Sequence, residues 1–334
     1  MSGLFVHKHA EAVRAQGVNV RVIFAQTWRD TWRQWRALRR EGWMPDVVQL
    51  NVIQKQGLLA LWLKKHYGIP YVIVEHWSGY LSENGQFMRM PALKQRFMRL
   101  VCRHASKVLA VSRVLQQAMH SCGLSAQEWG TIDNVVDDFF YEDRLTDRKK
   151  TTPLAEHRPK NLLHVSCFDE RAKNVKGLLR AAKMLSGKRQ DWRLVLVGTG
   201  VDYEEVRAFA HSLELPEGLL EWTGELTPRE VAQRMHEADA LVLSSRYETY
   251  GVVLAEAAAA GLPILSTPVG IAEETGALIV PQEIAQHKPG RFAEFMETIL
   301  FSDPSAKSEC ADRFSARTIG KQLTEIYEQV RGHR

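Results

Sequence analysis

Short apolar runs alternate with longer segments of helical periodicity along most of the chain. The first half contains four runs rich in Val and Ile, at 18–24 (VNVRVIF), 46–52 (DVVQLNV), 70–76 (PYVIVEH) and 107–112 (KVLAVS). Apolar runs of this length predict strands buried on both faces of a parallel sheet, and the intervening segments predict the helices that cover it. The first half therefore predicts a doubly wound α/β domain.

The same alternation resumes in the second half of the chain. Five runs follow, at 161–166, 193–198, 219–224, 240–245 and 263–268. Between the two series, residues 142–160 (EDRLTDRKKTTPLAEHRPK) are polar and charged and include prolines, which is typical of an interdomain linker. We therefore expect one domain over residues 1–148 and a second over residues 158–311.

The opening segment of the first domain has an unexpected pattern. Residues 3–17 (GLFVHKHAEAVRAQG) have helical periodicity, whereas a doubly wound domain ordinarily begins with a strand in the middle of its sheet. The segment allows two interpretations. Either the fold starts with a helix, or the N-terminus is shortened and lacks a central strand.

Composition narrows the class of protein. The 334 residues are 45% hydrophobic, which is enough for two cores. The net charge of +5 weakly favours anionic partners such as phosphates, nucleotides or a lipid surface, and it is too small to argue for nucleic acid. No apolar stretch reaches the length of a membrane span, and the first residues contain no signal-peptide core. The cysteines share no C-x-x-C spacing, which predicts neither disulfides nor a zinc site and fits a cytoplasmic protein: Cys102, Cys122, Cys167 and Cys310.

Residues 244–263 (SSRYETYGVVLAEAAAAGLP) carry the candidate chemistry. They predict a turn after a buried strand, then a helix that ends at Gly261. Parallel sheets bind ligands at the carboxyl ends of their strands, beside helix N-termini whose free amides favour anions. We therefore expect a phosphate or a sugar oxygen at the amides of Gly251, Val252 and Val253.

Two acids flank this helix N-terminus. Glu248 lies in the loop ahead of the helix, and Glu256 lies in its second turn among Ala and Val residues. A carboxylate in apolar surroundings needs hydrogen-bond donors, and sugar or ribose hydroxyls supply them. Because like charges repel, cations from another element are expected to hold any phosphate. The alternative is a surface helix with two solvated glutamates.

Residues 238–270 (ADALVLSSRYETYGVVLAEAAAAGLPILSTPVG) resemble the donor-site signature of retaining glycosyltransferases of family 4, the glycosyl transferases group 1, which have the GT-B fold. Other segments match the family in chain order: 3–23, 134–140 (NVVDDFF), 194–209, 221–239 and 313–330. The resemblance implies two Rossmann-like domains facing a cleft, an N-terminal one for the acceptor and a C-terminal one for a nucleotide-sugar donor. It also implies that the first strand of the N-terminal domain is missing, and that a last helix, at about 312–334, packs back on that domain.

The resemblance implies roles at matching positions. Glu248 would contact the hydroxyls of the donor sugar, and Glu256 would hold the nucleotide ribose. His76, at the end of the run 70–76, would approach the donor sugar, although a lone histidine there is equally compatible with an ordinary turn. The further donor-contact positions are Tyr250, Leu226, which would meet the base, and Gly198, together with the three amides at 251–253.

The segment 166–179 (SCFDERAKNVKGLL) departs from the family's pattern. The family usually has an Arg, a short acidic turn and then Lys-Gly; here Cys167 stands in place of the Arg, and Lys173 aligns with the Lys. Arg171 or Lys176 is a candidate for the missing cation; the alternative for both is a solvated loop.

The resemblance also implies a mechanism. No Asp-x-Asp motif for a divalent metal accompanies these segments. We expect Lys173, Arg171 and the helix N-terminus to stabilise the departing diphosphate instead, with no metal and no other cofactor. No pair of nucleophile and general base is evident, and the family's retaining chemistry implies attack on the same face of the sugar.

The acceptor is expected in the first domain, where two segments have basic faces. Residues 27–43 (TWRDTWRQWRALRREGW) place Trp28, Trp32 and Trp35 at helical spacing, beside a basic face of Arg29, Arg33, Arg36 and Arg40. Such a helix could lie on an anionic membrane that presents a lipid-linked acceptor. Alternatively, its tryptophans pack into the core of the domain and its arginines are solvated. The second segment, 94–107, has a basic side of Arg96, Arg99 and Arg103.

The leading hypothesis is a retaining glycosyltransferase that moves a sugar from a nucleoside-diphosphate sugar to a glycan or lipid-linked acceptor in bacterial surface polysaccharide synthesis. A truncated or degenerate, non-catalytic member of the family is the alternative, because of the missing strand and the replaced Arg. A nucleotide-sugar epimerase would lack the second acid on the helix. A dehydrogenase would need G-x-G-x-x-G after its first strand, and the partial match at 198–203 is in the wrong domain.

Overall fold

A computed structural model describes residues 2–142, 158–301 and 311–332. Its contacts divide the chain into unit 1, Met1–Val135 with Arg313–Arg334, and unit 2, Val136–Asp312. Most of the predicted linker, residues 143–157, lies outside the described residues, as does Cys310. Each unit is described by itself below.

Unit 1 has a four-stranded parallel sheet of order β1-β2-β3-β4. Its strands are β1 (Val48–Asn51), β2 (Tyr71–Glu75), β3 (Lys107–Ala110) and β4 (Trp129–Thr131). All five side chains of β2 are buried, as expected for a central strand of a parallel sheet. The connecting helices are α3 (Gly57–Tyr67), α4 (Gln86–Arg89), α5 (Ala92–His104) and α6 (Arg113–Ser121), with a 3-10 turn, η1, at Ser78–Tyr80.

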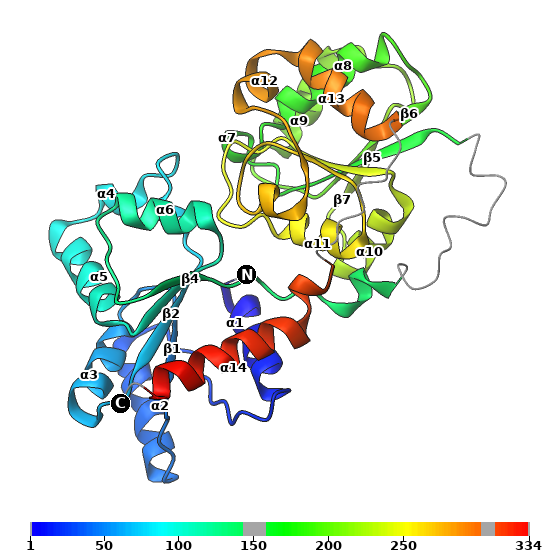
Figure 1. Cartoon of the computed structure of the whole chain (residues 1–334). Helices are drawn as coiled ribbons and strands as arrows, with labels where there is room; N and C mark the ends of the chain where they lie inside the picture. The colour runs from blue at the N-terminus through cyan, green and yellow to red at the C-terminus, as the bar shows by residue number, and fades with distance from the viewer. Residues whose placement is uncertain (1, 143–157, 302–310, 333–334) are drawn as a thin grey trace. The chain divides into compact units, whose positions relative to one another are not determined.

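Both ends of the chain contribute helices to unit 1. The N-terminal helix α1 (Ser2–Arg14) lies beside the C-terminal helix α14 (Ala316–Gly332), as Figure 1 shows in blue and red. Gly320 makes this close approach feasible, because a Cβ there would lie 2.3 Å from the carbonyl oxygen of Ala12. The turn η7 (Ala311–Phe314) precedes α14, and its Arg313 Nε donates to Asp133 Oδ2 at 2.7 Å. The last helix is thus tied to unit 1 by close packing and by an ion pair.

The strand predicted at residues 18–24 is wrong. This segment connects α1 to α2 (Trp28–Arg40) without regular structure, and its Val22 and Phe24 are exposed. A strand in a parallel sheet needs a neighbour, and β1 pairs only with β2 in the described chain. Side chains take the segment's carbonyl groups instead: Arg14 donates to Val20 O and Gln34 to Phe24 O.

The tryptophan stripe of α2 packs into unit 1. Trp35 is only 3% exposed and lies in a cluster with Leu59, Leu63 and Ile69. Trp28 and Trp32 are half-buried against the same cluster. The core interpretation of this stripe is therefore confirmed, with the four predicted arginines exposed on the other side. Among the described residues, no helix combines the length and apolar character that crossing a membrane requires.

Unit 2 has a six-stranded, fully parallel sheet of order β10-β9-β8-β5-β6-β7. Its strands are β5 (Lys160–Val165), β6 (Trp192–Val197), β7 (Leu220–Gly224), β8 (Ala240–Leu243), β9 (Ile264–Ser266) and β10 (Leu278–Ile279). The chain builds outward from β5 through β6 and β7, then returns to the other side of β5 with β8. The order reverses between β5 and β8, and ligands bind in doubly wound sheets at the carboxyl ends of the strands beside such a reversal.

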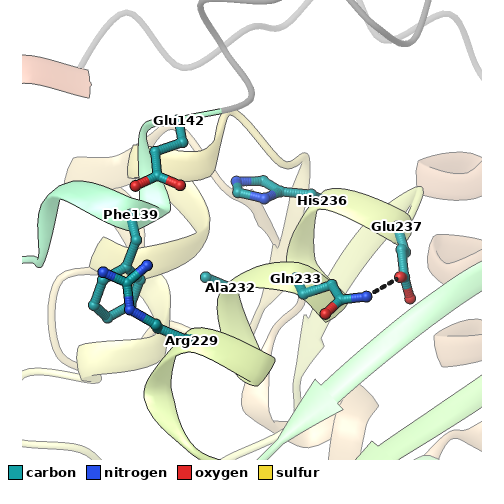
Figure 2. Close-up of a pocket in the computed structure, with 7 residues that line it drawn as sticks. All are labelled: Phe139, Glu142, Arg229, Ala232, Gln233, His236 and Glu237. Atoms are coloured by element: carbon teal, nitrogen blue, oxygen red, sulfur yellow. Dashed lines mark hydrogen bonds between the residues drawn. The ribbon is translucent and has the colours of Figure 1, made fainter.

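Helices cover both faces of this sheet (Figure 1). They are α7 (Glu170–Lys173), α8 (Val175–Ser186), α9 (Tyr203–Ser212), α10 (Pro228–Glu237), α11 (Val252–Ala260), α12 (Gln282–His287) and α13 (Pro289–Phe301), with a 3-10 turn, η6, at Ala272–Thr275. The chain enters unit 2 through the turn η2 (Asp138–Phe140), which lies against α10 beside a surface pocket (Figure 2).

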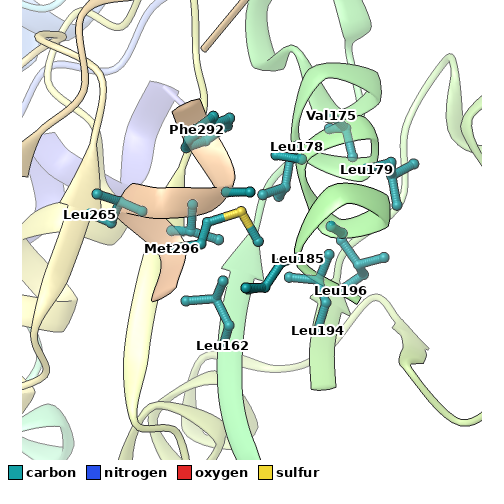
Figure 3. Packing of buried hydrophobic residues seen from close by; sticks show 14 of the residues in the cluster. Leu162, Val175, Leu178, Leu179, Leu185, Leu194, Leu196, Leu265, Phe292 and Met296 are labelled. Carbon is teal, nitrogen blue, oxygen red and sulfur yellow. The ribbon is translucent and has the colours of Figure 1, made fainter. Parts of the chain in front are cut away.

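The core of unit 2 fixes the strand that precedes the site. Leu178 and Leu185 of α8 pack with Phe292 and Met296 of α13 over Leu162 of β5 (Figure 3). Burial of such side chains contributes about 1.5–3 kcal/mol each. The predicted fold class, two parallel-sheet α/β domains, is confirmed. The loops after β5 and β8 therefore extend from strands that are fixed by a well-packed core.

Candidate active site at the sheet reversal of unit 2

The loops after β5 and β8 meet through an ion pair. Lys173, the last residue of α7, donates from Nζ to Glu248 Oε1 at 2.5 Å, and Ser245 Oγ donates to the same oxygen at 2.8 Å. The side chains of Lys173 and Glu248 are 15% and 14% exposed. Two site residues predicted from separate segments are therefore in contact. Both follow the strands between which the sheet order reverses.

The pair keeps Lys173 charged. Burial alone would lower the pKa of Lys173, but the charge of Glu248 and the hydrogen bond to it outweigh burial, and the pKa lies above its ordinary value. At neutral pH the site therefore presents a fixed ammonium group. A fixed cation of this kind is suited to an anionic ligand that arrives beside it.

Arg246 clamps the two loops together. Its guanidinium donates to the carbonyl of Glu170 and, from Nη2, to Asn174 Oδ1 at 2.9 Å. Its backbone amide donates to Ala172 O at 2.6 Å. These bonds hold the short helix α7, and hence Lys173, against the loop that carries Glu248. Sequence reasoning did not single out Arg246, although an Arg two residues before the first acid was the available signal.

The N-terminus of α11 completes this edge of the sheet. Gly251, its N-cap, has φ 78° and no side chain to cap the first turn, whose leading residues, Val252 and Val253, are half-buried. Tyr250 is buried, and its carbonyl accepts from Ile271 N at 3.0 Å. The α11 amides thus lie directly after the loop that holds Glu248, as the sequence predicted.

Glu256 is half-buried, while both of its neighbours in α11, Ala255 and Ala257, are fully buried. The helix therefore turns Glu256 toward the edge of its buried face. Its side chain is therefore partly accessible, although apolar residues surround it in the sequence. A partly accessible carboxylate is better suited to accept hydrogen bonds from a ligand than a fully enclosed one.

Two further predicted positions lie on neighbouring loops. Gly198 follows β6 with φ 119°, and a Cβ there would lie 2.0 Å from the carbonyl oxygen of Ser166, after β5. The loops after β5 and β6 therefore touch, and only glycine fits. Leu226 is half-buried in the loop between β7 and α10. Both residues are at the carboxyl edge that carries Lys173.

The two candidates for the missing cation, Arg171 and Lys176, make different contacts. Arg171 is exposed, and its Nη2 donates to the hydroxyl of Tyr247 at 3.2 Å, next to Glu248. Lys176 instead pairs with Glu205 of α9. It also lies 5.6 Å from the ring centroid of Phe209. Lys176 is thus engaged on another face and is the weaker candidate, whereas Arg171 lies with the paired residues.

His76 lies in unit 1, directly after β2. Its ring stacks on Phe5, with centroids 5.7 Å apart, and lies 6.1 Å from the ring of His9. Burial, and to a lesser extent His9, lowers the pKa of His76 to about 3, so the ring is neutral at pH 7. Its Nε2 is buried and has no hydrogen-bond partner in the described part of the chain.

The surface pocket of unit 2 is separate from these residues. Figure 2 shows it between η2 and α10, with the guanidinium of Arg229 4.8 Å from the ring centroid of Phe139. His236 lies within hydrogen-bonding distance of the carbonyl of Phe140. None of the predicted donor residues lines it. Within the described ranges, no group of three or more His, Cys, Asp or Glu side chains is arranged to hold a metal ion.

Comparison with known families agrees with the geometry. The profile described as glycosyl transferases group 1 matches residues 159–300, and that of glycosyltransferase family 4 matches residues 3–138. The chain belongs to glycosyltransferase family 4. This glycosyltransferase is 28% identical, over 85% of its length and 74% of the relative's, to the N-acetyl-α-D-glucosaminyl L-malate synthase of Bacillus anthracis. It is 26% identical to the GDP-mannose-dependent α-mannosyltransferase of Mycobacterium tuberculosis, over 91% of its length and 78% of the relative's.

Solved structures share the fold of this glycosyltransferase. The sucrose-phosphate synthase of Thermosynechococcus elongatus matches with a TM-score of 0.72 and 18% identity, over 100% of this chain and 94% of that chain. HepE of Anabaena, in complex with UDP, matches with a TM-score of 0.68 and 20% identity, over 90% and 82%. The predicted GT-B fold is thereby confirmed for the family 4 glycosyltransferase described here.

Proposed function

We propose that this glycosyltransferase moves a sugar, with retention of configuration, from a nucleoside-diphosphate sugar to a glycan or lipid-linked acceptor. The observation that carries the proposal is the Lys173–Glu248 pair beside the N-terminus of α11, at the reversal of the sheet order. The relatives are in keeping with it, since they include a GDP-mannose-dependent mannosyltransferase and a lipopolysaccharide 1,6-galactosyltransferase. The second relative motivates a role in bacterial surface polysaccharide synthesis.

In this proposal the donor lies along the carboxyl edge of the unit 2 sheet. Glu248 accepts hydrogen bonds from hydroxyls of the donor sugar, and Glu256 accepts them from the ribose. The base meets the backbone at Leu226. The diphosphate lies at the α11 amides, from Gly251 through Val252 and Val253, where Tyr250 and Gly198 shape the adjoining loops. This arrangement keeps both acids on hydroxyls and leaves the phosphate oxygens to donors and cations.

The chemistry follows from where charge develops. As the bond from the anomeric carbon to the phosphate oxygen breaks, negative charge grows on the diphosphate. Lys173, Arg171 and the α11 amides stabilise that charge, which is the task a divalent metal performs in other enzymes. The acceptor oxygen bonds to the anomeric carbon on the face that the phosphate leaves, and its proton passes to the departing phosphate oxygen. We propose that no metal takes part.

Nucleotide binding tests the donor site. We expect UDP, GDP or ADP to raise the melting temperature of the protein, because a ligand at one hundred times its Kd adds about 2.7 kcal/mol of stability. Glu256→Gln should reduce that shift, since it removes the ribose acceptor, while leaving the melting temperature without nucleotide nearly unchanged. The matched control is Glu217→Gln, an exposed acid away from the site.

Turnover completes this test. Hydrolysis of UDP-glucose or GDP-mannose by the wild-type protein would support catalysis. Nucleotide binding without turnover of any donor would favour the degenerate, non-catalytic alternative that the replacement of Arg by Cys167 suggests. Absence of a thermal shift with all three nucleotides would contradict the proposed donor site itself.

For a lipid-linked acceptor, we propose that α5 contacts an anionic membrane. Leu93 is 79% exposed on α5, and Arg96 and Arg103 are exposed on the same helix. Arg99 is committed elsewhere, because its guanidinium donates to Cys122 O at 2.9 Å. Exposed apolar and basic side chains on one helix favour an interfacial position at anionic lipid. Helix α2 is the weaker candidate, because its tryptophans face the core.

Liposome flotation checks the membrane contact. We expect binding to phosphatidylglycerol vesicles and not to phosphatidylcholine vesicles, with about 1 kcal/mol contributed by each basic residue near the surface. Arg96→Glu together with Leu93→Asp should abolish flotation. The matched control changes Arg36 and Arg40 of α2 to Glu, both exposed on the other basic helix. Equal flotation of both double variants would contradict the assignment to α5.

A further inference from the structure

The carboxyl group of Glu75 is fully buried at the end of β2. Its Oε1 accepts hydrogen bonds from the backbone amides of His76 and Trp77, both at 2.9 Å. Its Oε2 accepts from the amide of Ile53 at 3.1 Å and from the hydroxyl of Tyr80 at 3.3 Å. In the described chain, no Lys or Arg forms an ion pair with it. The carboxyl is held by four hydrogen-bond donors and no cation.

These four bonds join two loops at the carboxyl edge of the unit 1 sheet. Ile53 follows β1, directly after Val52, whose φ of 63° is unusual for a β-branched residue. His76, Trp77 and Tyr80 follow β2. A buried carboxyl is costly unless its oxygens are satisfied, so the loops must keep these amides in place for the group to remain buried. The same bonds therefore fix the backbone at His76.

The ring of His76 also makes a contact of its own. It stacks on Phe5 with an interplanar angle of 12°, and its Nε2 remains buried without a hydrogen-bond partner within the described residues. A neutral ring with an unpartnered nitrogen is suited to meet a hydroxyl group. The ring can do so only if its backbone holds the observed orientation. That orientation depends on the residue before it.

We propose that Glu75 is a positioning residue for sugar transfer, which holds His76 in the orientation needed to contact the donor sugar. The inference rests on the proposed function, because it takes the contact with the donor sugar as the role of His76. Glu75 touches no substrate in this proposal. Its effect on catalysis passes entirely through the His76 backbone.

The chemistry of glutamine makes this testable. Gln has nearly the same shape as Glu, but only one of its two terminal atoms accepts hydrogen bonds. In Glu75→Gln, an amide nitrogen must therefore face either the Ile53 N–H or the two N–H groups of His76 and Trp77. A donor that faces a donor displaces one of the loops. A misplacement of about 1 Å at a site costs about 100-fold in rate.

A double-mutant cycle isolates the proposed route. The kcat for hydrolysis of UDP-glucose or GDP-mannose, whichever the wild-type protein turns over, is measured for wild type, Glu75→Gln, His76→Ala and the double variant. We expect Glu75→Gln to lower kcat about 10- to 100-fold. We expect the double variant to match His76→Ala within about twofold, because the second change removes a contact already lost. If the reductions in kcat caused by Glu75→Gln and by His76→Ala multiply in the double variant, the proposal is overturned.

Two further variants keep the test independent of folding. Tyr80→Phe removes one donor and leaves the carboxyl intact; a fall in kcat of about threefold, absent in the His76→Ala background, supports the proposal even where Glu75→Gln lowers the melting temperature. Glu83→Gln, an exposed acid eight residues on, is the matched control and should match wild type. If His76→Ala alone leaves kcat unchanged, the role of His76 fails. If Tyr80→Phe lowers kcat in the His76→Ala background as well, the proposed role of Glu75 is overturned, whereas the role of His76 is not affected.

Discussion

Glu248→Gln is expected to lower kcat/KM for sugar transfer about 100- to 1,000-fold, the range seen when one preorganised electrostatic group is removed from an active site. Gln keeps the shape of the side chain but loses the charge that meets Lys173 at 2.5 Å. The largely buried ammonium of Lys173 then lacks a counter-charge. The hydroxyls of the donor sugar also donate to a weaker hydrogen-bond acceptor. Steady-state transfer or donor hydrolysis measures the change.

Stability and a matched variant separate this effect from unfolding. The melting temperature of Glu248→Gln should also fall, because the Lys173 ammonium is only 15% exposed and loses its counter-charge, so the kinetics are compared at a temperature at which the variant is fully folded. Glu217→Gln makes the same chemical change at an exposed position of unit 2 and should retain full activity. Wild-type kinetics in Glu248→Gln would remove the central support of the proposed function.

Lys173→Met is expected to lower kcat/KM by a similar factor, about 100- to 1,000-fold, but to act on the leaving group. Met retains much of the length and apolar volume of Lys and removes the charge that we assign to the departing diphosphate. The variant should therefore also bind a free nucleoside diphosphate more weakly, whereas Glu248→Gln should not. Isothermal titration with UDP, GDP or ADP compares the two variants directly.

The control for this variant is Lys188→Met, which removes an exposed charge from the same unit. It should leave both the Kd of the nucleotide and the kinetics unchanged. If Lys173→Met retained wild-type affinity and turnover, the diphosphate would have to be held elsewhere, with Arg171 as the next candidate. A double change at Arg171 and Lys173 would then decide between the two.

The fold was largely readable from the sequence because parallel strands buried on both faces are continuous apolar runs. Eight of the nine predicted runs coincide with strands β1–β3 and β5–β9. The run at 18–24 failed because its alternating Val and Ile residues match a strand, while a strand also needs a partner that no local pattern reveals. The strands β4 and β10 were missed because they have only three and two residues.

The candidate site was predicted in part. The acids Glu248 and Glu256 and the helix N-terminus at Gly251 stand in one contiguous segment, so a sequence pattern can select them together as candidates. The contact of Lys173 with Glu248 spans 75 residues and depends on the sheet order, which the sequence does not state. Arg246 was missed because its partners are mostly backbone carbonyls. Its side-chain partners, Asn174 and Glu170, stand 72 and 76 residues earlier in the chain, so no local pattern reveals the clamp.

Glu75 was missed for a related reason. A single acid at the end of an apolar run looks like the first solvated residue after a strand. Its burial follows from the loops that close over it, whose donors are three backbone amides and one tyrosine. Backbone donors are common to every sequence, so the pattern of residue types carries no signal for them.

The path of the chain through unit 1 has a consequence for biosynthesis. The polypeptide leaves this unit after Val135 and re-enters it only at Arg313. On the ribosome, unit 2 emerges as one uninterrupted stretch, whereas α1 of unit 1 can pack against Gly320 only after α14 has been translated. The usual vectorial order, in which the N-terminal domain matures first, is thereby reversed. Of the two units, the one that appears first along the chain is therefore completed after the other.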